Sequence, residues 1–324
     1  MKSKKILITG CAGFIGFHTV KLFLIKNYKV VGIDDLNKYY DSKLKIKRLN
    51  ILKKFNNFKF CKADINNRNQ LKKIFNTKFD IVIHLAAQAG VRYSITNPYE
   101  YFSTNLLGFC NILQLSKEKK ISKFIYASSS SVYGEKNMIP FSEDNSDADN
   151  PIQLYAATKR SNEIIAKSYN NLFNMNLIGL RFFTVYGEWG RPDMFLMKYL
   201  TSSFDRTKKF YLNNFGNHTR DFTYILDACE IIEKLLFSKK KQRKHQIFNI
   251  CSNNPIKLLN IVSELNKLTT KKPKIYRRKL QEADVIKTHG SNKKISSIIG
   301  NKKFIPIKNG LLNTLNWFKQ YYNY

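Results

Sequence analysis

Residues 6–16 read ILITGCAGFIG, an apolar run that continues into three glycines spaced three residues apart. A helical pattern follows through Leu24, and a second apolar run, KVVGI at residues 29–33, ends at Asp34. This order predicts a strand, a glycine turn, a helix and a second strand. Glycine allows a positive φ at Gly10 and close packing of helix against strand at Gly16.

The glycine turn is typical of a dinucleotide-binding site. Gly13 lets the backbone approach a pyrophosphate, and the helix N-terminus offers unpaired N–H groups to an anion. Asp34 lies at the ~20-residue offset where an acidic side chain accepts a hydrogen bond from a ribose 2′-hydroxyl. Because a carboxylate there would repel a 2′-phosphate, the sequence predicts NAD rather than NADP. An ordinary turn is the alternative for a glycine triplet, and the strand–turn–helix context argues against it.

Alternating strand and helix patterns extend this unit along the chain. Further apolar strand candidates lie at residues 58–61, 80–87, 123–127, 176–181 and 246–250, and helical patterns at 98–119, 154–173, 256–268 and 311–318. We predict an α/β fold with a doubly wound parallel sheet of the Rossmann type and a smaller, mixed C-terminal domain. The NAD-binding domain is expected at 1–181, with a returning segment near 217–251, and the substrate domain mainly at 182–324.

The composition describes a chain of 324 residues that is 43% hydrophobic and carries a formal net charge of +33. Such a chain can bury a large core. Its lysines are spread along the sequence, and only KKKQRK at residues 239–244 forms a dense block, which a solvated loop explains. We therefore expect no nucleic-acid partner, although the positive field should attract an anionic substrate.

Cysteines and apolar segments give information about the cellular compartment. The five cysteines are scattered without a CxxC pair, which argues against a disulfide framework. No segment approaches the ~18 uninterrupted apolar residues of a membrane span, and the first strand begins too early for a signal peptide. We expect a cytoplasmic protein without a membrane partner, and no metal site is predicted.

A tyrosine and a lysine form the catalytic candidate. Tyr155 and Lys159 are four residues apart and lie on the same face of a predicted helix. A free phenol has a pKa of ~10, and a nearby ammonium, with the positive nicotinamide ring, favours the phenolate required of a general base. A helical surface pair is the alternative. The preceding strand ends in four serines at residues 128–131, which favours an active site.

These motifs together resemble a known enzyme family. TGCAGFIG at residues 9–16, HLAA at 84–87, SSSSVYG at 128–134 and YAATK at 155–159 are similar to extended short-chain dehydrogenases/reductases that act on nucleotide sugars. Matching the serine run by its distance from VYG places the family's hydroxyl catalyst on Ser129, with Ser128 and Ser130 as alternatives. The resemblance implies that Lys159 holds the nicotinamide ribose and keeps the phenol acidic.

Other stretches resemble UDP-glucuronate 4-epimerases in particular. They are GIDDLNKYYD at residues 32–41, AQAGVRYS at 87–94, RFFTVYG at 181–187, WGRPDM at 189–194 and RDFTY at 220–224. Glu188 and Leu226 depart from the family pattern outside the proposed chemistry. Sugar-nucleotide dehydratases and the related decarboxylases carry a glutamate beside the hydroxyl catalyst, where this chain has Ser130 and Ser131. The resemblance implies oxidation and reduction at C4 through a 4-keto sugar, without elimination of water.

The resemblance also assigns binding residues. Those implied for NAD are Gly10, Gly13, Phe14, Ile15, Gly16, Asp34, Asn37, Asp64, Ile65, Leu85, Ala86, Ala87, Tyr155 and Lys159; Asp64 serves equally well as a helix cap. Those implied for the UDP-sugar are Arg92, Ser129, Thr184, Arg191, Arg220 and Asp284. Arg191, with Thr184, is expected to hold the uronate carboxylate. A surface pair with Asp193 is the alternative for Arg191, and Arg92 and Arg220 could be structural.

The family suggests a homodimer joined through the helices that begin near Pro98 and Tyr155. Two other functions remain open. One is 4-epimerisation of a neutral UDP-hexose such as UDP-glucose, and the other is a non-catalytic dinucleotide- or RNA-binding protein. The presence of Tyr155, Lys159 and Ser129 argues against the second.

Overall fold

The computed structural model describes residues 4–135, 138–144, 151–238, 245–281 and 284–324. Within these residues, seven strands form one parallel sheet in the order β10-β6-β5-β4-β1-β2-β3. The strands are β1 (Lys5–Thr9), β2 (Lys29–Asp34), β3 (Phe58–Lys62), β4 (Ile81–His84), β5 (Lys123–Ser129), β6 (Leu177–Phe182) and β10 (His245–Ile250). The predicted doubly wound parallel sheet is confirmed.

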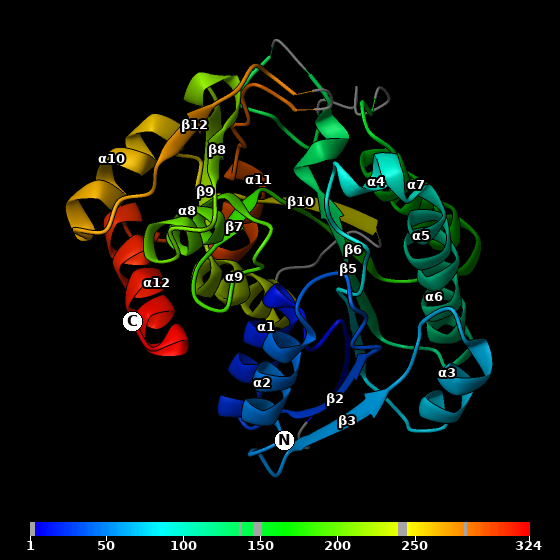
Figure 1. The fold of residues 1–324 in the computed structure, drawn as a ribbon. Coiled ribbons are helices and arrows are strands. Elements are labelled where there is room, and N and C mark those ends of the chain that lie inside the picture. The colour runs from blue at the N-terminus through cyan, green and yellow to red at the C-terminus, as the bar shows by residue number, and fades with distance from the viewer. Residues whose placement is uncertain (1–3, 136–137, 145–150, 239–244, 282–283) are drawn as a thin grey trace.

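Helices cover both faces of this sheet (Figure 1). One face carries α1 (Phe14–Ile25), α2 (Ser42–Leu52) and α9 (Ile225–Phe237), and the other carries α3 (Arg68–Phe75), α6 (Phe109–Glu118) and α7 (Leu154–Phe173). Side chains alternate between the two sides of a strand. In β1, Ile6 and Ile8 accordingly join the core beside Phe17, while Leu7 joins the core beside Phe109, and all are fully buried. Burial on both faces explains the continuous apolar runs.

The order of the strands fixes where a ligand can bind. The chain runs outward from β1 to β3, then returns to β4 on the other side of β1. At such a reversal the loops at the carboxyl ends of the neighbouring strands diverge and leave a crevice. Thr9 and His84 are paired at the ends of β1 and β4, so the glycine turn and the loop after β4 leave the sheet at the same level.

The predicted helix at 98–119 is interrupted. It follows α4 (Tyr93–Thr96) and is divided into α5 (Pro98–Tyr101), a π-helical segment (Phe102–Gly108) and α6. The Asn105 side chain in that segment bonds the loop after β4, because its Oδ1 accepts from Gln88 N at 2.8 Å and its Nδ2 donates to Gln88 O at 3.0 Å. The wider turn thus satisfies the backbone of a loop that borders the crevice.

The C-terminal half adds two small sheets and more helices. The sheets are β11 (Pro255–Lys257), β9 (Thr219–Tyr224) and β7 (Thr184–Tyr186), and separately β12 (Ile275–Arg277) with β8 (Phe210–Leu212). The helices are α8 (Phe195–Phe204), α10 (Leu258–Leu268), α11 (Lys293–Ile299) and α12 (Ile307–Tyr322), with 3-10 turns at Ser130–Tyr133 and Asn213–Gly216. Residues 256–257, predicted to begin a helix, pair with β9 instead. β10 extends the main sheet beside β6, and the division into two domains stays a prediction.

Candidate active site

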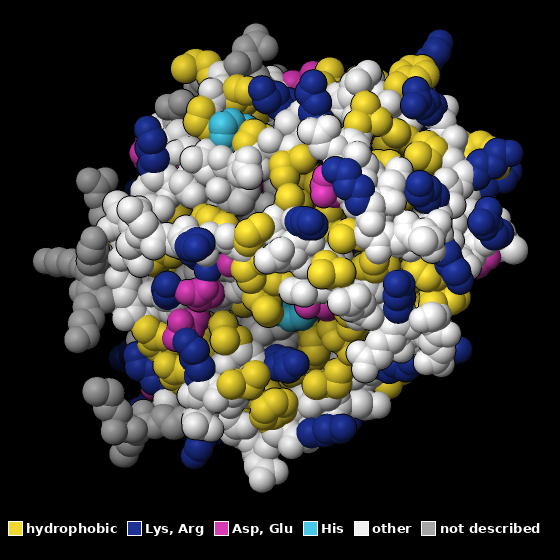
Figure 2. Space-filling view, turned by 90° about the vertical axis from the view of Figure 1, so that its left-hand side faces the viewer, with side chains coloured by type: hydrophobic (Ala, Val, Ile, Leu, Met, Phe, Trp, Pro, Cys, Tyr) yellow, Lys and Arg dark blue, Asp and Glu magenta, His cyan; other side chains and the backbone are white. Residues whose placement is uncertain are grey.

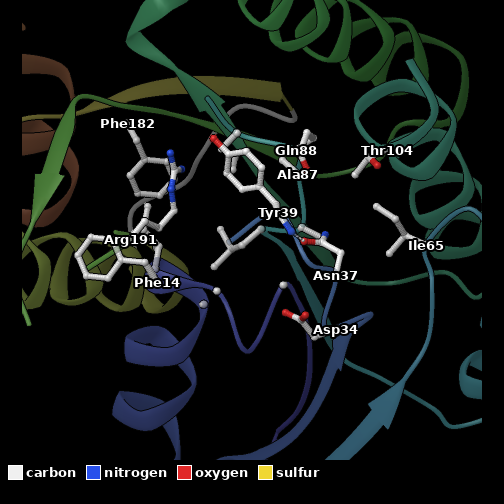
Figure 3. A pocket seen from close by; sticks show the side chains of 18 of the residues that line it. Phe14, Asp34, Asn37, Tyr39, Ile65, Ala87, Gln88, Thr104, Phe182 and Arg191 are labelled. Carbon is white, nitrogen blue, oxygen red and sulfur yellow. Dashed lines mark hydrogen bonds between the residues drawn. The ribbon is translucent and has the colours of Figure 1, made fainter. Parts of the chain in front are cut away.

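A cleft opens at the carboxyl ends of β1, β2, β4, β5 and β6 and holds about 1310 Å³ of space, open solvent included. Every residue predicted to contact the cofactor lines this cleft, and so do Ser129 and Arg191. In Figure 3, Asp34 lies apart from Arg191 and Phe182, with Tyr39 between them. The cleft therefore has a cofactor side near β2 and a second side near residues 182–194.

The glycine turn has the geometry that a bound diphosphate requires. Gly10 has a φ of +71°, and a Cβ added there would lie 2.8 Å from the backbone nitrogen of Ala86. A Cβ on Gly16 would lie 1.9 Å from the carbonyl oxygen of Gly10, so a side chain cannot fit between helix and turn. Gly13 precedes α1 without any side-chain cap. The first N–H groups of the helix are thus left for an anion, which fits a dinucleotide.

Asp34 ends β2 beside this turn. Its Oδ2 accepts from Ala12 N at 3.0 Å and its Oδ1 accepts from Leu36 N at 2.9 Å. Burial raises the pKa of the Asp34 carboxyl, and the charge of Lys45 opposes this shift. The sequence argument missed Lys45, which lines the cleft and donates to the backbone and side-chain oxygens of Asn37 at 2.9 and 2.8 Å. Nothing local distinguishes it from the other lysines of α2.

Asp64 was open to two interpretations, contact with NAD and helix cap. The cap of α3 is Asn67, whose Oδ1 accepts from Gln70 N at 3.1 Å. Asp64 lines the cleft, and its own Oδ1 accepts from Asn66 N at 2.9 Å. The structure thus assigns the cap of α3 to Asn67.

Tyr155 lies in the first turn of α7 and meets Ser129 at the end of β5. Burial raises the pKa of the Tyr155 phenol, while a hydrogen bond with the Ser129 side chain and the positive charge of Arg191 lower it. Lys159 is 1% exposed, and burial lowers its pKa to about 8. Its ammonium donates to Ala127 O at 3.0 Å. The positive charge of Arg191 therefore acts on the phenol in this structure, which the sequence argument did not foresee, and the effect expected of Lys159 stays a prediction.

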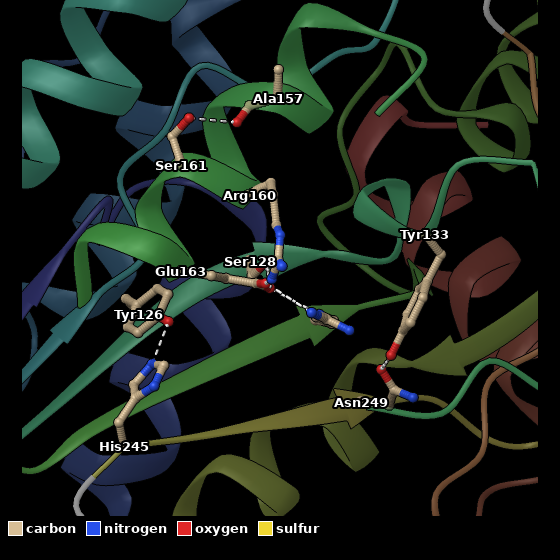
Figure 4. Close-up of polar contacts among 10 residues, drawn as sticks. Tyr126, Ser128, Tyr133, Ala157, Arg160, Ser161, Glu163, His245 and Asn249 are labelled. Carbon is tan, nitrogen blue, oxygen red and sulfur yellow. Dashed lines mark hydrogen bonds and ion pairs between the residues drawn. The ribbon is translucent and has the colours of Figure 1, made fainter. Parts of the chain in front are cut away.

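Ser128, which precedes Ser129 in β5, is held in a buried ionic network (Figure 4). Ser128 donates to Oε1 of Glu163 at 2.6 Å, and the Arg181 guanidinium donates to both oxygens of the same carboxylate at 2.8 Å. Ser129 accepts from the backbone nitrogen of Ser131 and donates to the Ser131 hydroxyl, both at 3.1 Å. Because Ser129, unlike Ser128, also makes a hydrogen bond with the Tyr155 side chain, Ser129 is the better placed partner for Tyr155.

Arg191 forms the ion pair with Asp193 that was considered as its alternative role. Its Nε donates to Oδ1 of Asp193 at 3.0 Å and its Nη2 donates to Oδ2 at 2.7 Å. The side chain also lines the cleft. Tyr39, which the sequence argument did not single out, donates its hydroxyl to Asp193 at 3.1 Å. This pairing fixes the orientation of the guanidinium at the second side of the cleft.

The other proposed substrate residues lie around the main lining. Thr184 lines a smaller adjoining hollow that shares Phe14 and Met194 with the cleft. Arg92 and Asp284 form an ion pair at 2.6 Å. Arg220 donates to the carbonyl oxygens of Thr219 and Ile286, both at 3.0 Å, and burial lowers its pKa to about 10 against the opposing charge of Asp284. The structure thus gathers Arg92, Arg220 and Asp284 in one charged group.

Three other features concern the surface charge, the cysteines and the possibility of a membrane-spanning helix. Lysines and arginines are scattered over the face seen in Figure 2 among apolar and neutral side chains. All five cysteines are free thiols. The described part of the chain holds no helix of the length and apolar character needed to span a bilayer.

Comparisons with known proteins identify the family of this chain. Residues 6–251 match the family model of the NAD dependent epimerase/dehydratase family. An uncharacterised protein of Methanocaldococcus jannaschii is 44% identical, covering 98% of this chain and 97% of its own. A UDP-glucuronate 4-epimerase of Thermodesulfobacterium geofontis is 39% identical, covering 97% of this chain and 96% of its own.

Solved structures are also similar to this chain over most of its length. Two structures of UDP-glucuronic acid 4-epimerase from Bacillus cereus are each 33% identical and cover 98% of this chain and 100% of theirs. One is a variant in complex with NAD and a 4-deoxy-4-fluoro analogue of UDP-glucuronic acid, with a TM-score of 0.92, and the other holds UDP-glucuronic acid and NAD, with a TM-score of 0.90. The cleft, its glycine turn and these matches over most of the chain lead to one conclusion: the protein belongs to the NAD dependent epimerase/dehydratase family.

Proposed function

We propose that the protein is an NAD-dependent UDP-glucuronate 4-epimerase that inverts C4 to give UDP-galacturonate. The observation that carries the proposal is the contact of Tyr155 with Ser129 in the cleft that also holds the glycine turn and Arg191. The proposed C4 chemistry needs a base, a hydroxyl partner and a cation beside the cofactor, and these three residues would supply them. The full-length similarity to UDP-glucuronate 4-epimerases supports the choice of substrate.

The chain's own residues move the proton. Tyr155 takes the proton of the C4 hydroxyl and returns it after the sugar has turned, while Ser129 holds the same oxygen by a hydrogen bond. Bound NAD supplies the chemistry of accepting and returning the C4 hydride. Lys159 holds the ribose, the turn at Gly13 binds the diphosphate, and Asp34 accepts from the adenosine ribose.

Arg191 is proposed to hold the uronate carboxylate, with Thr184 beside it. A 4-ketouronate is a β-keto acid and can lose CO2, so a carboxylate held by charge-assisted hydrogen bonds would be restrained from leaving. Asp193 already accepts from Nε and Nη2, which leaves the other edge of the guanidinium for the substrate. Arg92, Arg220 and Asp284 are proposed to bind the UDP portion.

The decisive experiment is incubation of the purified protein with UDP-glucuronate and separation of the products. Formation of UDP-galacturonate supports the proposal. Faster conversion of UDP-glucose to UDP-galactose would favour the neutral-hexose alternative. Salt-dependent RNA binding without turnover of either sugar would favour a non-catalytic protein.

A pair of variants tests the choice of serine. We expect Ser129→Ala to lower kcat about a hundredfold, since it removes a hydrogen bond made to the reacting oxygen. Ser128→Ala removes a donor to Glu163 instead and should act mainly on thermal stability, by about 1–2 kcal/mol. A larger loss of kcat in Ser128→Ala would reassign the catalyst.

A homodimer in the cytoplasm completes the proposal. Large apolar side chains are exposed on the helical region suggested as the interface: Ile95, Tyr99, Leu107, Ile164 and Leu172. Exposed large apolar side chains on these helices favour an interaction site there. Light scattering of the eluted protein should give twice the mass of one chain, and Leu107→Glu should shift it toward the monomer.

A further inference from the structure

Arg48 on α2 is a buried cation that hydrogen-bonds backbone and hydroxyl oxygens rather than a carboxylate of the described residues. Its side chain is fully buried, and it forms no ion pair with any carboxylate of the described residues. Buried charges are usually paired because leaving water is costly. Its Nη1 donates to Ala12 O at 2.9 Å and to the Tyr40 hydroxyl at 2.7 Å, and its Nη2 donates to the carbonyl oxygen of Trp189. The guanidinium thus joins segments far apart in sequence.

The first segment is the glycine turn. Ala12 lies inside it, and two side chains hold its backbone: Asp34 accepts from its N–H and Arg48 donates to its carbonyl oxygen. Both side chains come from the stretch between β2 and the end of α2. Because the turn would bind the diphosphate with its backbone, anything that fixes Ala12 also fixes the cofactor seat.

The second segment is the loop that carries Arg191. Trp189 has a φ of +58°, a backbone conformation that residues other than glycine rarely adopt. Its ring packs against Phe17, Trp317 and Tyr321, with centroids 5.5, 5.2 and 5.2 Å away. The bond from Arg48 holds the carbonyl oxygen of this constrained residue, two positions before Arg191.

We infer that Arg48 is a positioning residue that couples the cofactor-binding turn to the Arg191 loop. Its charge lies behind the turn, where the Asp34 carboxylate acts on it electrostatically without forming an ion pair. We expect this charge to add to the attraction for the diphosphate. NAD affinity and preference for a uronate should therefore change together when Arg48 is altered. The uronate part of this inference rests on the proposed function, whereas the NAD part does not.

The test measures NAD affinity by calorimetry on protein stripped of cofactor, and KM for UDP-glucuronate and UDP-glucose. We expect Arg48→Met to weaken NAD binding about tenfold or more and to lower the preference for UDP-glucuronate by a similar factor, since bonds from a charged donor are lost. Arg48→Lys keeps the charge but cannot reach both carbonyl oxygens, so it should restore NAD affinity in part and the preference less.

Lys302→Met is the matched control. Lys302 is a mostly buried cation that pairs with Asp227 of α9 at 2.9 Å. Neither residue lines the cleft. Its loss should lower the thermal midpoint while NAD affinity and substrate preference stay unchanged. If Arg48→Met lowers only the thermal midpoint, as Lys302→Met should, the coupling is refuted. It is also refuted if Arg48→Met changes NAD affinity without the preference for UDP-glucuronate, or the preference without the affinity.

Two further arms keep the test decisive. Should Arg48→Met fail to fold, Arg48→Lys and Tyr40→Phe replace it; the latter removes one acceptor of Arg48 and should shift both readouts in the same direction by a smaller factor. Should the wild-type protein leave UDP-glucuronate unconverted, the proposed function fails, and NAD affinity alone decides whether Arg48 supports the turn. Unchanged NAD affinity in every variant overturns the inference.

Discussion

The two sides of the cleft are built from different materials. The cofactor side consists of backbone and small side chains at strand ends, with Gly10 and Gly16 packed too closely to accept a Cβ. The second side combines apolar side chains with Arg191, which is already paired with Asp193, and a second pair, Arg92 with Asp284, lies outside the lining. A backbone cradle receives its ligand without rearrangement, whereas paired charges must share or exchange partners with a substrate. The first suits a cofactor that stays bound, and the second a substrate that turns and leaves.

Removing the Tyr155 hydroxyl, which lies in the same cleft, should have the largest effect on kcat. We expect Tyr155→Phe to lower kcat by about 10²–10⁴, because the general base is lost while the ring remains. Affinities for NAD and for UDP-glucuronate, measured by calorimetry, should stay close to those of the wild type. A kcat within tenfold of the wild type would remove Tyr155 from the chemistry.

An added methyl group should break the cofactor side alone. In Gly16→Ala the new Cβ would meet Gly10 O at 1.9 Å, so the turn must move. We expect a loss of about 1–3 kcal/mol in stability and about tenfold weaker NAD binding. Gly179→Ala on β6 is the control, because its Cβ would meet the Tyr126 hydroxyl at 2.7 Å instead and should cost stability without affecting NAD. Equal NAD affinities in both variants would contradict a rigid cradle.

Removing the charge of Arg191 should change the substrate preference set by the second side and leave NAD affinity unchanged. Arg191→Ala should raise KM for UDP-glucuronate about tenfold relative to UDP-glucose, since one charge-assisted interaction is lost. Asp193→Asn keeps the shape of the pair but frees the charge of Arg191, and it should retain the preference for the uronate. If Arg191→Ala still prefers UDP-glucuronate as strongly as the wild type, the clamp is wrong.

The last expected effect is a pH dependence of stability on the cofactor side. Burial lowers the pKa of Lys159 to about 8, against ~10.4 for an unfolded lysine. Between these values the unfolded chain binds a proton that the native protein has released, so stability without NAD should rise with pH, by at most about 3 kcal/mol. Thermal midpoints of the wild type minus those of Lys159→Met, measured from pH 7 to 10, should increase. Parallel curves would show that Lys159 keeps its proton.

Much of the cofactor side could be predicted from the sequence because its signals are local. The strand–turn–helix unit lies within the first 34 residues, and α7 has the predicted bounds, Leu154–Phe173. Parallel strands place their carboxyl ends at one edge, so motifs that end different strands converge without further information. The whole predicted cofactor set lines the cleft for that reason.

The remainder depends on contacts that no local pattern contains. Arg48 reaches Ala12, 36 positions away, and Trp189, 141 positions away, yet it looks like any other cation of a basic helix. The π-helical segment at Phe102–Gly108 is tied to the bond between Asn105 and Gln88, and β11 exists only through its pairing with β9. Tertiary contacts decide these features, so single-sequence periodicity predicted a helix in both places.

The position of β10 has a consequence for how the protein is made. β6 borders β5, the strand that ends at Ser129, and its outer edge is covered only when β10 pairs with it. On the ribosome, residues 177–182 are synthesised well before residues 245–250. The nascent chain therefore contains β6 with the backbone groups of its outer edge unpaired until β10 is made. Cells starved of chaperones, or any gene fragment that stops before β10, should therefore yield aggregates rather than a smaller dinucleotide-binding protein.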